Sequence, residues 1–234
     1  MERTFKIIYT SDTHGHIFPV NYAAGCGESS GLLNLAAQID KNGNTLVLDG
    51  GDSLQGTPLV QYYLAHADEF PHHPVAEAFN AMGCDYFTLG NHDFNFGTDY
   101  LGSYLGNLNA RCVCENVSAK NGCAPLYPAR VHTLENGLRV GIVGIVTDYV
   151  NIWERPEHIA SIRISDPIPA AAAALEKLKT ISDVTLCVYH GGFERDLATG
   201  RVLSATHENV AYRICQELDF DILLTGHQHM SVPG

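Results

Sequence analysis

The chain has 234 residues, of which 45% are hydrophobic and 17% are charged, and its formal net charge at pH 7 is −12. This apolar content is sufficient for the core of one large α/β domain, so we expect a single domain over residues 1–234. The acidic balance argues against nonspecific nucleic-acid binding, which requires clusters of Lys and Arg. An anionic substrate is still compatible with the charge, because bound cations reverse the local field.

The first ten residues, MERTFKIIYT, lack the basic region and long apolar stretch of a signal peptide. They predict a short strand that begins at once. No segment reaches the roughly 18–20 apolar residues that cross a bilayer. We therefore expect no membrane association, and a cytoplasmic protein if Met1 is the native start.

Apolar, β-branched runs alternate with helical patterns along the chain. Expected strands are, in order, residues 5–10, 45–49, 85–89, 139–146, 184–190 and 221–225. Expected helices are residues 31–41, 166–179 and 206–218. Between residues 130–134 and 138–146, Asn136-Gly137 is typical of a tight turn that joins antiparallel strands. The sequence thus predicts a layered α/β fold with mixed sheets.

Five of the six expected strands end in an Asp, Asn or His beside glycine. Sites in α/β sheets gather beyond the carboxyl ends of strands, so these side chains should converge. Imidazole and carboxylate together suit borderline divalent ions, and glycine permits close turns of the backbone. Without a cation, so many carboxylates would repel one another. The residues concerned are Asp12 and His14, Asp52, Asn91 to Asp93, His190, and His227 and His229.

Each element taken alone is weak evidence for a metal site. A D-x-H sequence occurs by chance, an Asp after a strand is often a helix cap, and a lone His is more often structural than a ligand. All five in this order favour a metal centre.

The motifs D-x-H, G-D, G-N-H-D, H and G-H-x-H, in this order, resemble those of the calcineurin-like metallophosphoesterases. Residues 90–97, residues 190–196, Glu208-Asn209 and Tyr212 resemble the 5'-nucleotidase branch, which includes UDP-sugar hydrolases and 2',3'-cyclic-nucleotide phosphodiesterases. The similarity runs from Ile7 to Met230. It implies an αββα sandwich with mixed β-sheets and the hydrolysis of phosphoesters, with a nucleotide as the small-molecule substrate.

Position by position, the resemblance implies two divalent ions (Mn, Fe, Zn, Co or Mg) that share Asp52. Such a pair lowers the pKa of a shared water, supplies hydroxide for in-line attack and clamps the phosphate oxygens. The first ion would be held by Asp12, His14, Asp52 and His229. The second would be held by Asp52, Asn91, His190 and His227.

His92 is implied to face the phosphoryl group, where it would stabilise the developing charge and protonate the leaving oxygen. The 5'-nucleotidase pattern usually has an Asp three residues later, and this chain has Asn95. An amide can hold a tautomer but cannot stabilise an imidazolium by charge, so we expect weaker general-acid catalysis. Asn95 is reminiscent of the cyclic-nucleotide phosphodiesterases, which inclines the expected substrate towards a cyclic or activated ester. Asp93 is expected to point elsewhere.

Members of this branch usually carry a C-terminal domain that stacks the nucleobase, and this sequence ends at Gly234, so we expect catalysis with little base specificity. One alternative is a non-catalytic metal-binding module for interaction or sensing, but such a module has no use for His92. Others are a phosphoprotein phosphatase, which the nucleotidase-like motifs disfavour, and a nuclease, which the acidic charge disfavours. The oligomeric state is left open. His72 and His73, between two prolines, are expected in a solvated loop.

Overall fold

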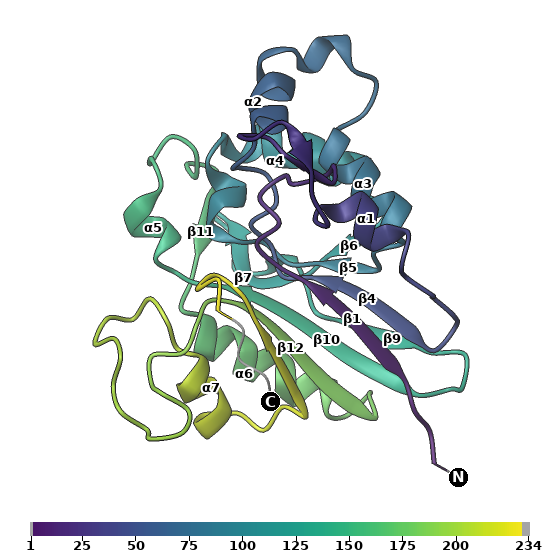
Figure 1. The fold of residues 1–234 in the computed structure, drawn as a ribbon. Coiled ribbons are helices and arrows are strands. Elements are labelled where there is room, and N and C mark those ends of the chain that lie inside the picture. Colours follow the sequence, from purple (N-terminus) through teal and green to yellow (C-terminus); the bar gives the residue numbers. More distant parts are fainter. Residues whose placement is uncertain (1, 231–234) are drawn as a thin grey trace.

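The computed structural model describes residues 2–230. Two β-sheets pack face to face, and helices cover the outer face of each (Figure 1). The predicted αββα layering with mixed sheets is confirmed. No helix within the described range is both long and apolar enough to cross a bilayer.

The first sheet is entirely parallel and has the order β1-β4-β5-β6. Its strands are β1 (Lys6–Thr10), β4 (Thr45–Asp49), β5 (Tyr86–Phe87) and β6 (Arg111–Cys112). The helices on its outer side are α1 (Leu32–Ala36), α2 (Pro58–Ala65), α3 (Pro74–Met82) and α4 (Gly97–Asn107).

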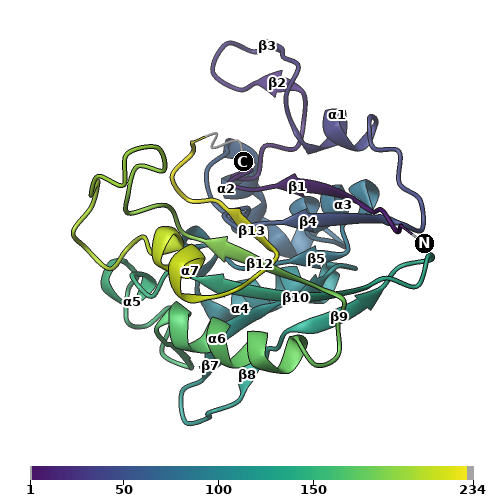
Figure 2. The ribbon, with the colours of Figure 1, turned by 90° about the horizontal axis from the view of Figure 1, so that it is seen from below.

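The second sheet has the order β13-β12-β10-β9 and is mixed, because β9 pairs antiparallel with β10 while the other pairs are parallel. Its strands are β9 (Arg130–Thr133), β10 (Arg139–Val146), β12 (Val184–His190) and β13 (Ile222–Thr225). Two helices, α6 (Pro167–Leu178) and α7 (Ala211–Glu217), cover its outer face (Figure 2). The hairpin predicted at Asn136-Gly137 is present as the β9–β10 connection.

Smaller elements complete the chain. An antiparallel sheet has the order β11-β7-β8, and β2 pairs with β3. The bounds are β2 (Val20–Asn21), β3 (Cys26–Gly27), β7 (Cys114–Ala119), β8 (Pro125–Tyr127), β11 (Ile162–Ile164), α5 (Val150–Trp153), and the 3-10 turns η1 (Ala67–Glu69) and η2 (Asn91–Phe94).

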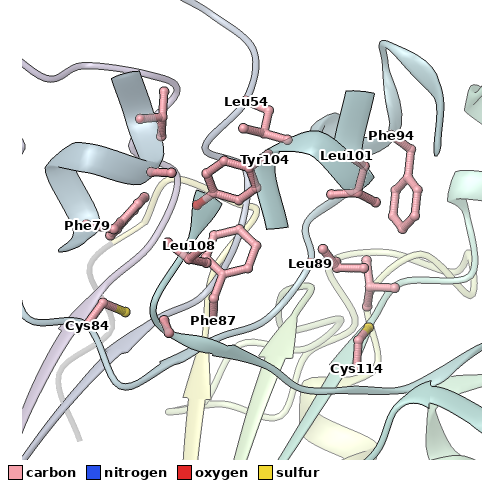
Figure 3. Packing of buried hydrophobic residues seen from close by; sticks show 14 of the residues in the cluster. Leu54, Phe79, Cys84, Phe87, Leu89, Phe94, Leu101, Tyr104, Leu108 and Cys114 are labelled. Carbon is pink, nitrogen blue, oxygen red and sulfur yellow. The ribbon is translucent and has the colours of Figure 1, made fainter. Parts of the chain in front are cut away.

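Three clusters of buried side chains correspond to the three interfaces between the four layers. The alternation of side chains along a strand decides which cluster each residue joins. In β4, Leu46 and Leu48 face the opposite sheet and Val47 faces the helices. Under the helices of the first sheet, Phe87 packs edge-on against Tyr104 with their ring centroids 5.4 Å apart (Figure 3).

Two predicted helices are shorter than their sequence patterns suggested. Helix α1 has no side-chain cap at Gly31, and the chain after Ala36 tightens into i→i+3 hydrogen bonds. Helix α7 begins at Ala211, because Glu208 and Asn209 are bound by other segments through the carbonyl oxygen of Glu208 and the side chain of Asn209.

The solvated loop predicted for His72 and His73 is wrong for His73. His73 is fully buried and caps α3, with its Nδ1 accepting from the Val75 N–H at 3.2 Å and its Nε2 2.9 Å from the Tyr100 hydroxyl. Burial lowers the pKa of His73 to about 4. The helix starts at Pro74, so the preceding residue becomes the cap and is drawn in against α4.

Candidate metal centre

The site lies where the carboxyl ends of the strands of the two sheets meet. The hydroxyl of Tyr9, in β1, donates to the carbonyl oxygen of Thr225, in β13, at 3.1 Å, which joins the edge strands of the two sheets. The loop after β1 is bound to the loop after β4, since Asp12 N donates to Gly51 O and His14 N to Asp52 O, both at 2.9 Å. The ends of five strands therefore converge at one side of the molecule, where sites in α/β sheets usually lie.

The structure brings the candidate ligands together in two groups. In each group, one possible ligand atom per residue lies within 4.8 Å of the others. Asn91, at the start of η2, is buried and lines the same pocket as His227. The first group is Asp12, His14 and His229, and the second is Asp52, His190 and His227.

The backbone singles out the same residues independently. Five non-glycine residues within 2–230 have positive φ, and all five belong to the candidate ligand set. A side chain in this left-handed region costs about 1–2 kcal/mol, and such strain is concentrated at functional sites. The five are Asp12 (φ 55°), His14 (48°), Asp52 (59°), His227 (76°) and His229 (51°).

Glycines permit the close approach of the loops that carry these ligands. A Cβ on Gly51, whose φ is +92°, would overlap the backbone of Gly90, and a Cβ on Gly90 would overlap Asp52. The G-D motif at Gly51 and the G-N-H-D motif at Gly90 are thus in direct backbone contact at their glycines.

Two imidazoles are held by backbone carbonyl groups. Nδ1 of His14 lies 2.7 Å from the carbonyl oxygen of Gln55, and Nδ1 of His190 lies 2.6 Å from that of Gly50. A carbonyl oxygen only accepts, so each Nδ1 carries a hydrogen, and a ring in its neutral form turns the Nε2 lone pair to the site.

Possible ligand atoms face one another across the site. Nε2 of His14 is 3.1 Å from Nε2 of His229, and Nε2 of His190 is 3.1 Å from Oδ2 of Asp52. Nε2 of His190 and Oδ1 of Asn91 are buried without a hydrogen-bond partner. A buried unpaired acceptor is costly, and a cation shared between such atoms removes the cost. Nitrogen and carboxylate donors with no thiolate suit a borderline divalent ion, so the residues present fit a metal centre.

Protons and cations compete for this site. Burial alone would raise the pKa of Asp52, but His190 and His92 lower it below its ordinary range. Burial would likewise lower the pKa of His190, and the Asp52 carboxylate raises it instead to about 9. A positive charge is therefore favoured between these two side chains.

Asp93 supports the site from behind, and, as predicted, it points away from His92. It is fully buried, and its carboxylate accepts four backbone N–H groups at 2.8–3.1 Å, from residues 52, 53, 54 and 90. Burial and the nearby Asp52 charge raise the pKa of Asp93 to about 6. These hydrogen bonds join the loop that carries Asp52 to the start of η2.

The predicted catalytic pair lies beside the second ligand group. Nδ1 of His92 is 2.7 Å from Oδ1 of Asn95, and the backbone N–H of His92 donates to Oδ1 of Asp52 at 2.7 Å. The ring of His92 is 5.5 Å from that of His14, centroid to centroid. A cavity of about 400 Å³ opens here, lined by residues 91, 92, 95, 150, 153, 154, 208 and 227.

Three polar or aromatic side chains of this cavity were not among the site residues predicted from the sequence. Glu208 Oε1 is 3.0 Å from Nε2 of His227, and the ring of Trp153 stacks on His227 with the centroids 5.6 Å apart. Glu154 contacts Asn95. Glu208 was visible only within the motifs that carry the family resemblance, and nothing local in the sequence marks Trp153 or Glu154.

The layered fold brings a cluster of His and Asp side chains together where the strands of its two sheets end, and these side chains could hold metal ions. The chain belongs to the calcineurin-like phosphoesterase family, whose model matches residues 5–231.

Several relatives match nearly the whole chain. The trifunctional nucleotide phosphoesterase protein YfkN of Bacillus subtilis is 29% identical over 98% of this chain and 17% of its own length. A 2',3'-cyclic-nucleotide 2'-phosphodiesterase/3'-nucleotidase of Salmonella typhimurium is 25% identical over 98% of this chain and 37% of its own. Among solved structures, a candidate 5'-nucleotidase from Staphylococcus aureus superposes with a TM-score of 0.86 and 33% identity, over 97% of this chain and 45% of that one. The chain therefore spans less than half the length of these relatives.

Proposed function

We propose that this chain is a phosphoester hydrolase that acts on small nucleotides through a centre of two divalent ions. The observation that carries the proposal is the left-handed backbone at five candidate ligands, together with the ring nitrogens and carboxylate oxygens that face one another across the site. Strain and unpaired acceptors at one point favour a bound cation over a structural role for the same residues. The family match and the nucleotide-hydrolysing relatives support the chemistry and the substrate class.

In this proposal Asp52 would help to hold both ions. When bound, the ions would activate water and offset the charge on the phosphoryl oxygens. The carbonyl oxygens of Gln55 and Gly50 keep His14 and His190 in the tautomer that can ligate. Asp12, His14, Asp52 and His229 would hold one ion, and Asp52, Asn91, His190 and His227 the other.

His92 would act on the substrate, not on a metal. Its backbone N–H is bound to Asp52 and its Nδ1 to Asn95, so Nε2 is the ring nitrogen left to meet the substrate. There it would stabilise charge on the phosphoryl group and give a proton to the leaving oxygen.

The test is phosphate release from metal-stripped protein after Mn, Co, Zn or Mg is restored. Substrates would be a 5'-nucleotide, a 3'-nucleotide, a 2',3'-cyclic nucleotide, p-nitrophenyl phosphate and bis-p-nitrophenyl phosphate, with a coupled phosphatase for the diesters. Preference for the cyclic ester would support the phosphodiesterase assignment, and preference for 5'-monoesters would support a nucleotidase. Full metal binding without any turnover would instead support a non-catalytic module.

Two variants separate metal binding from catalysis. Asp52→Asn should lower metal content and turnover together, because it removes the shared carboxylate. His92→Ala should keep the metals and lower turnover by about 10²–10⁴-fold, the usual contribution of a general acid. Metal analysis of both purified variants checks the assignment, and a metal-free His92→Ala protein would show that His92 belongs to the ligand shell.

A further inference from the structure

A buried carboxylate lies behind the His92–Asn95 pair. Glu154 directly follows α5, and only 6% of its side chain is exposed. Its Oε2 accepts a hydrogen bond from Nδ2 of Asn95 at 2.6 Å. Its Oε1 accepts from the backbone N–H of Arg155 at 2.8 Å and lies 2.8 Å from Nδ1 of His158, a half-buried ring.

These contacts determine which tautomer His92 adopts. A carboxylate is only an acceptor, so the amino group of the Asn95 amide must face Glu154. The amide oxygen must then face His92, whose Nδ1 lies 2.7 Å away and has to carry the hydrogen. Nε2 of His92 is left for the substrate: it takes up the proton that it later gives to the leaving oxygen, and the amide oxygen of Asn95 accepts from Nδ1–H in both the neutral and the charged ring.

We infer that Glu154 is a positioning residue for His92 and acts through the Asn95 amide. The inference rests on the proposed function and assigns Glu154 a part in it. The sequence alone suggested that Asn95 deprives His92 of a negative partner. In the structure the negative charge is present on Glu154, on the far side of the Asn95 amide. Glu154 orients and polarises this amide, and the amide in turn orients and polarises the imidazole of His92.

Glu154→Gln tests this chain of hydrogen bonds with almost no change in shape. The Arg155 N–H still requires an acceptor, so the new amide keeps its oxygen there and turns its amino group towards Asn95. The Asn95 side chain must then flip and present its own amino group to Nδ1 of His92, which loses its hydrogen. The ring is then neutral while Nε2 carries its proton, and giving that proton away would leave an imidazolate, so His92 becomes a much weaker acid. We expect kcat on a nucleotide to fall by about 10- to 100-fold, part of the full general-acid contribution, with KM little changed.

The leaving group offers a readout that a merely structural role would not change. p-Nitrophenolate leaves without protonation, whereas the sugar hydroxyl of a nucleotide requires a proton. Glu154→Gln should therefore reduce turnover of the nucleotide much more than that of p-nitrophenyl phosphate.

A second substitution should restore what the first removes. With Asn95→Asp added to Glu154→Gln, the new carboxylate accepts both from Nδ1 of His92 and from the amino group of the new amide. All donors are paired again, and most of the lost kcat should return. Glu157→Gln is the matched control, because this exposed glutamate lies only three residues further on.

The tautomer of His92 can be read directly by nitrogen-15 NMR of the metal-free protein, with the signal assigned from His92→Gln. The wild type and the double variant should carry the hydrogen on Nδ1, and Glu154→Gln should carry it on Nε2. An unchanged tautomer in Glu154→Gln, or a double variant as slow as the single one, would overturn the inference. Absence of turnover in the metal-loaded wild type would instead refute the proposed function, and the NMR result would still decide the role of Glu154.

Discussion

Because the backbone of the candidate ligands is strained, glycine should be more stabilising than alanine at Asp12, whereas alanine is the more stabilising residue at most other positions. Asp12 has a φ of 55°, so any residue with a Cβ is disfavoured there. Asp12→Ala and Asp12→Gly both remove the carboxylate that accepts from His227 N and from Ser11, so the difference between them isolates the Cβ. Ala in this region costs about 1–2 kcal/mol, and the greater freedom of unfolded Gly costs about 0.5–1 kcal/mol. Asp12→Gly should therefore be more stable than Asp12→Ala by about 0.5–1 kcal/mol.

The assay is urea unfolding of the metal-free proteins, compared at equal m values. The matched pair is Asp99→Ala and Asp99→Gly on the exposed face of α4, where the Gly variant should be the less stable by up to about 1 kcal/mol. If the two pairs gave the same order, the left-handed conformation at Asp12 would not be imposed by the fold, and the strain argument for the centre would fail.

Two further predictions concern the buried carboxylates behind the ligands. Asp93→Asn places an amino group against two of the four backbone N–H groups that donate to Asp93, so the free energy of unfolding should fall by about 2–5 kcal/mol. The control is Asp196→Asn, at a partly exposed carboxylate that accepts from the backbone N–H of Thr199. An equal effect of both substitutions would contradict this role of Asp93. Burial raises the pKa of Asp49 to about 8, so its contribution to stability is fully present below about pH 4 and is lost as the pH rises through 8. In chemical unfolding of the metal-free proteins, the free energy of unfolding of the wild type should fall relative to that of Asp49→Asn between pH 4 and 8. A difference between the two proteins that stays constant over this pH range would refute the prediction.

The candidate site was predictable from the sequence because its signals are local. The seven predicted ligands lie at or within a few residues after the ends of five apolar strands, and the strand order brings these ends together. The sequence therefore suffices to predict that Asp52 and His190 are metal-type donors and that glycines lie beside them. The same holds for the antiparallel β9–β10 hairpin, which one Asn-Gly pair predicted.

Other features could not be predicted because they join distant segments. His73 looked like a loop residue beside two prolines, and its burial depends on tyrosines of α4. Helix α7 was predicted too long, since the periodicity does not show that the carbonyl oxygen of Glu208 is bound by Thr147 and Tyr189.

The sequence by itself determined which side chains gather at the sheet edge and which chemistry their donor atoms suit. Only the tertiary structure decided how those atoms are oriented: the left-handed backbone at the ligands, the carbonyl oxygens that hold His14 and His190, and Glu154 behind Asn95. The reason is physical. Strand periodicity and turn residues act between near neighbours, whereas a tautomer or an amide orientation is set by a partner such as Glu154, which lies 59 positions from Asn95 in the chain.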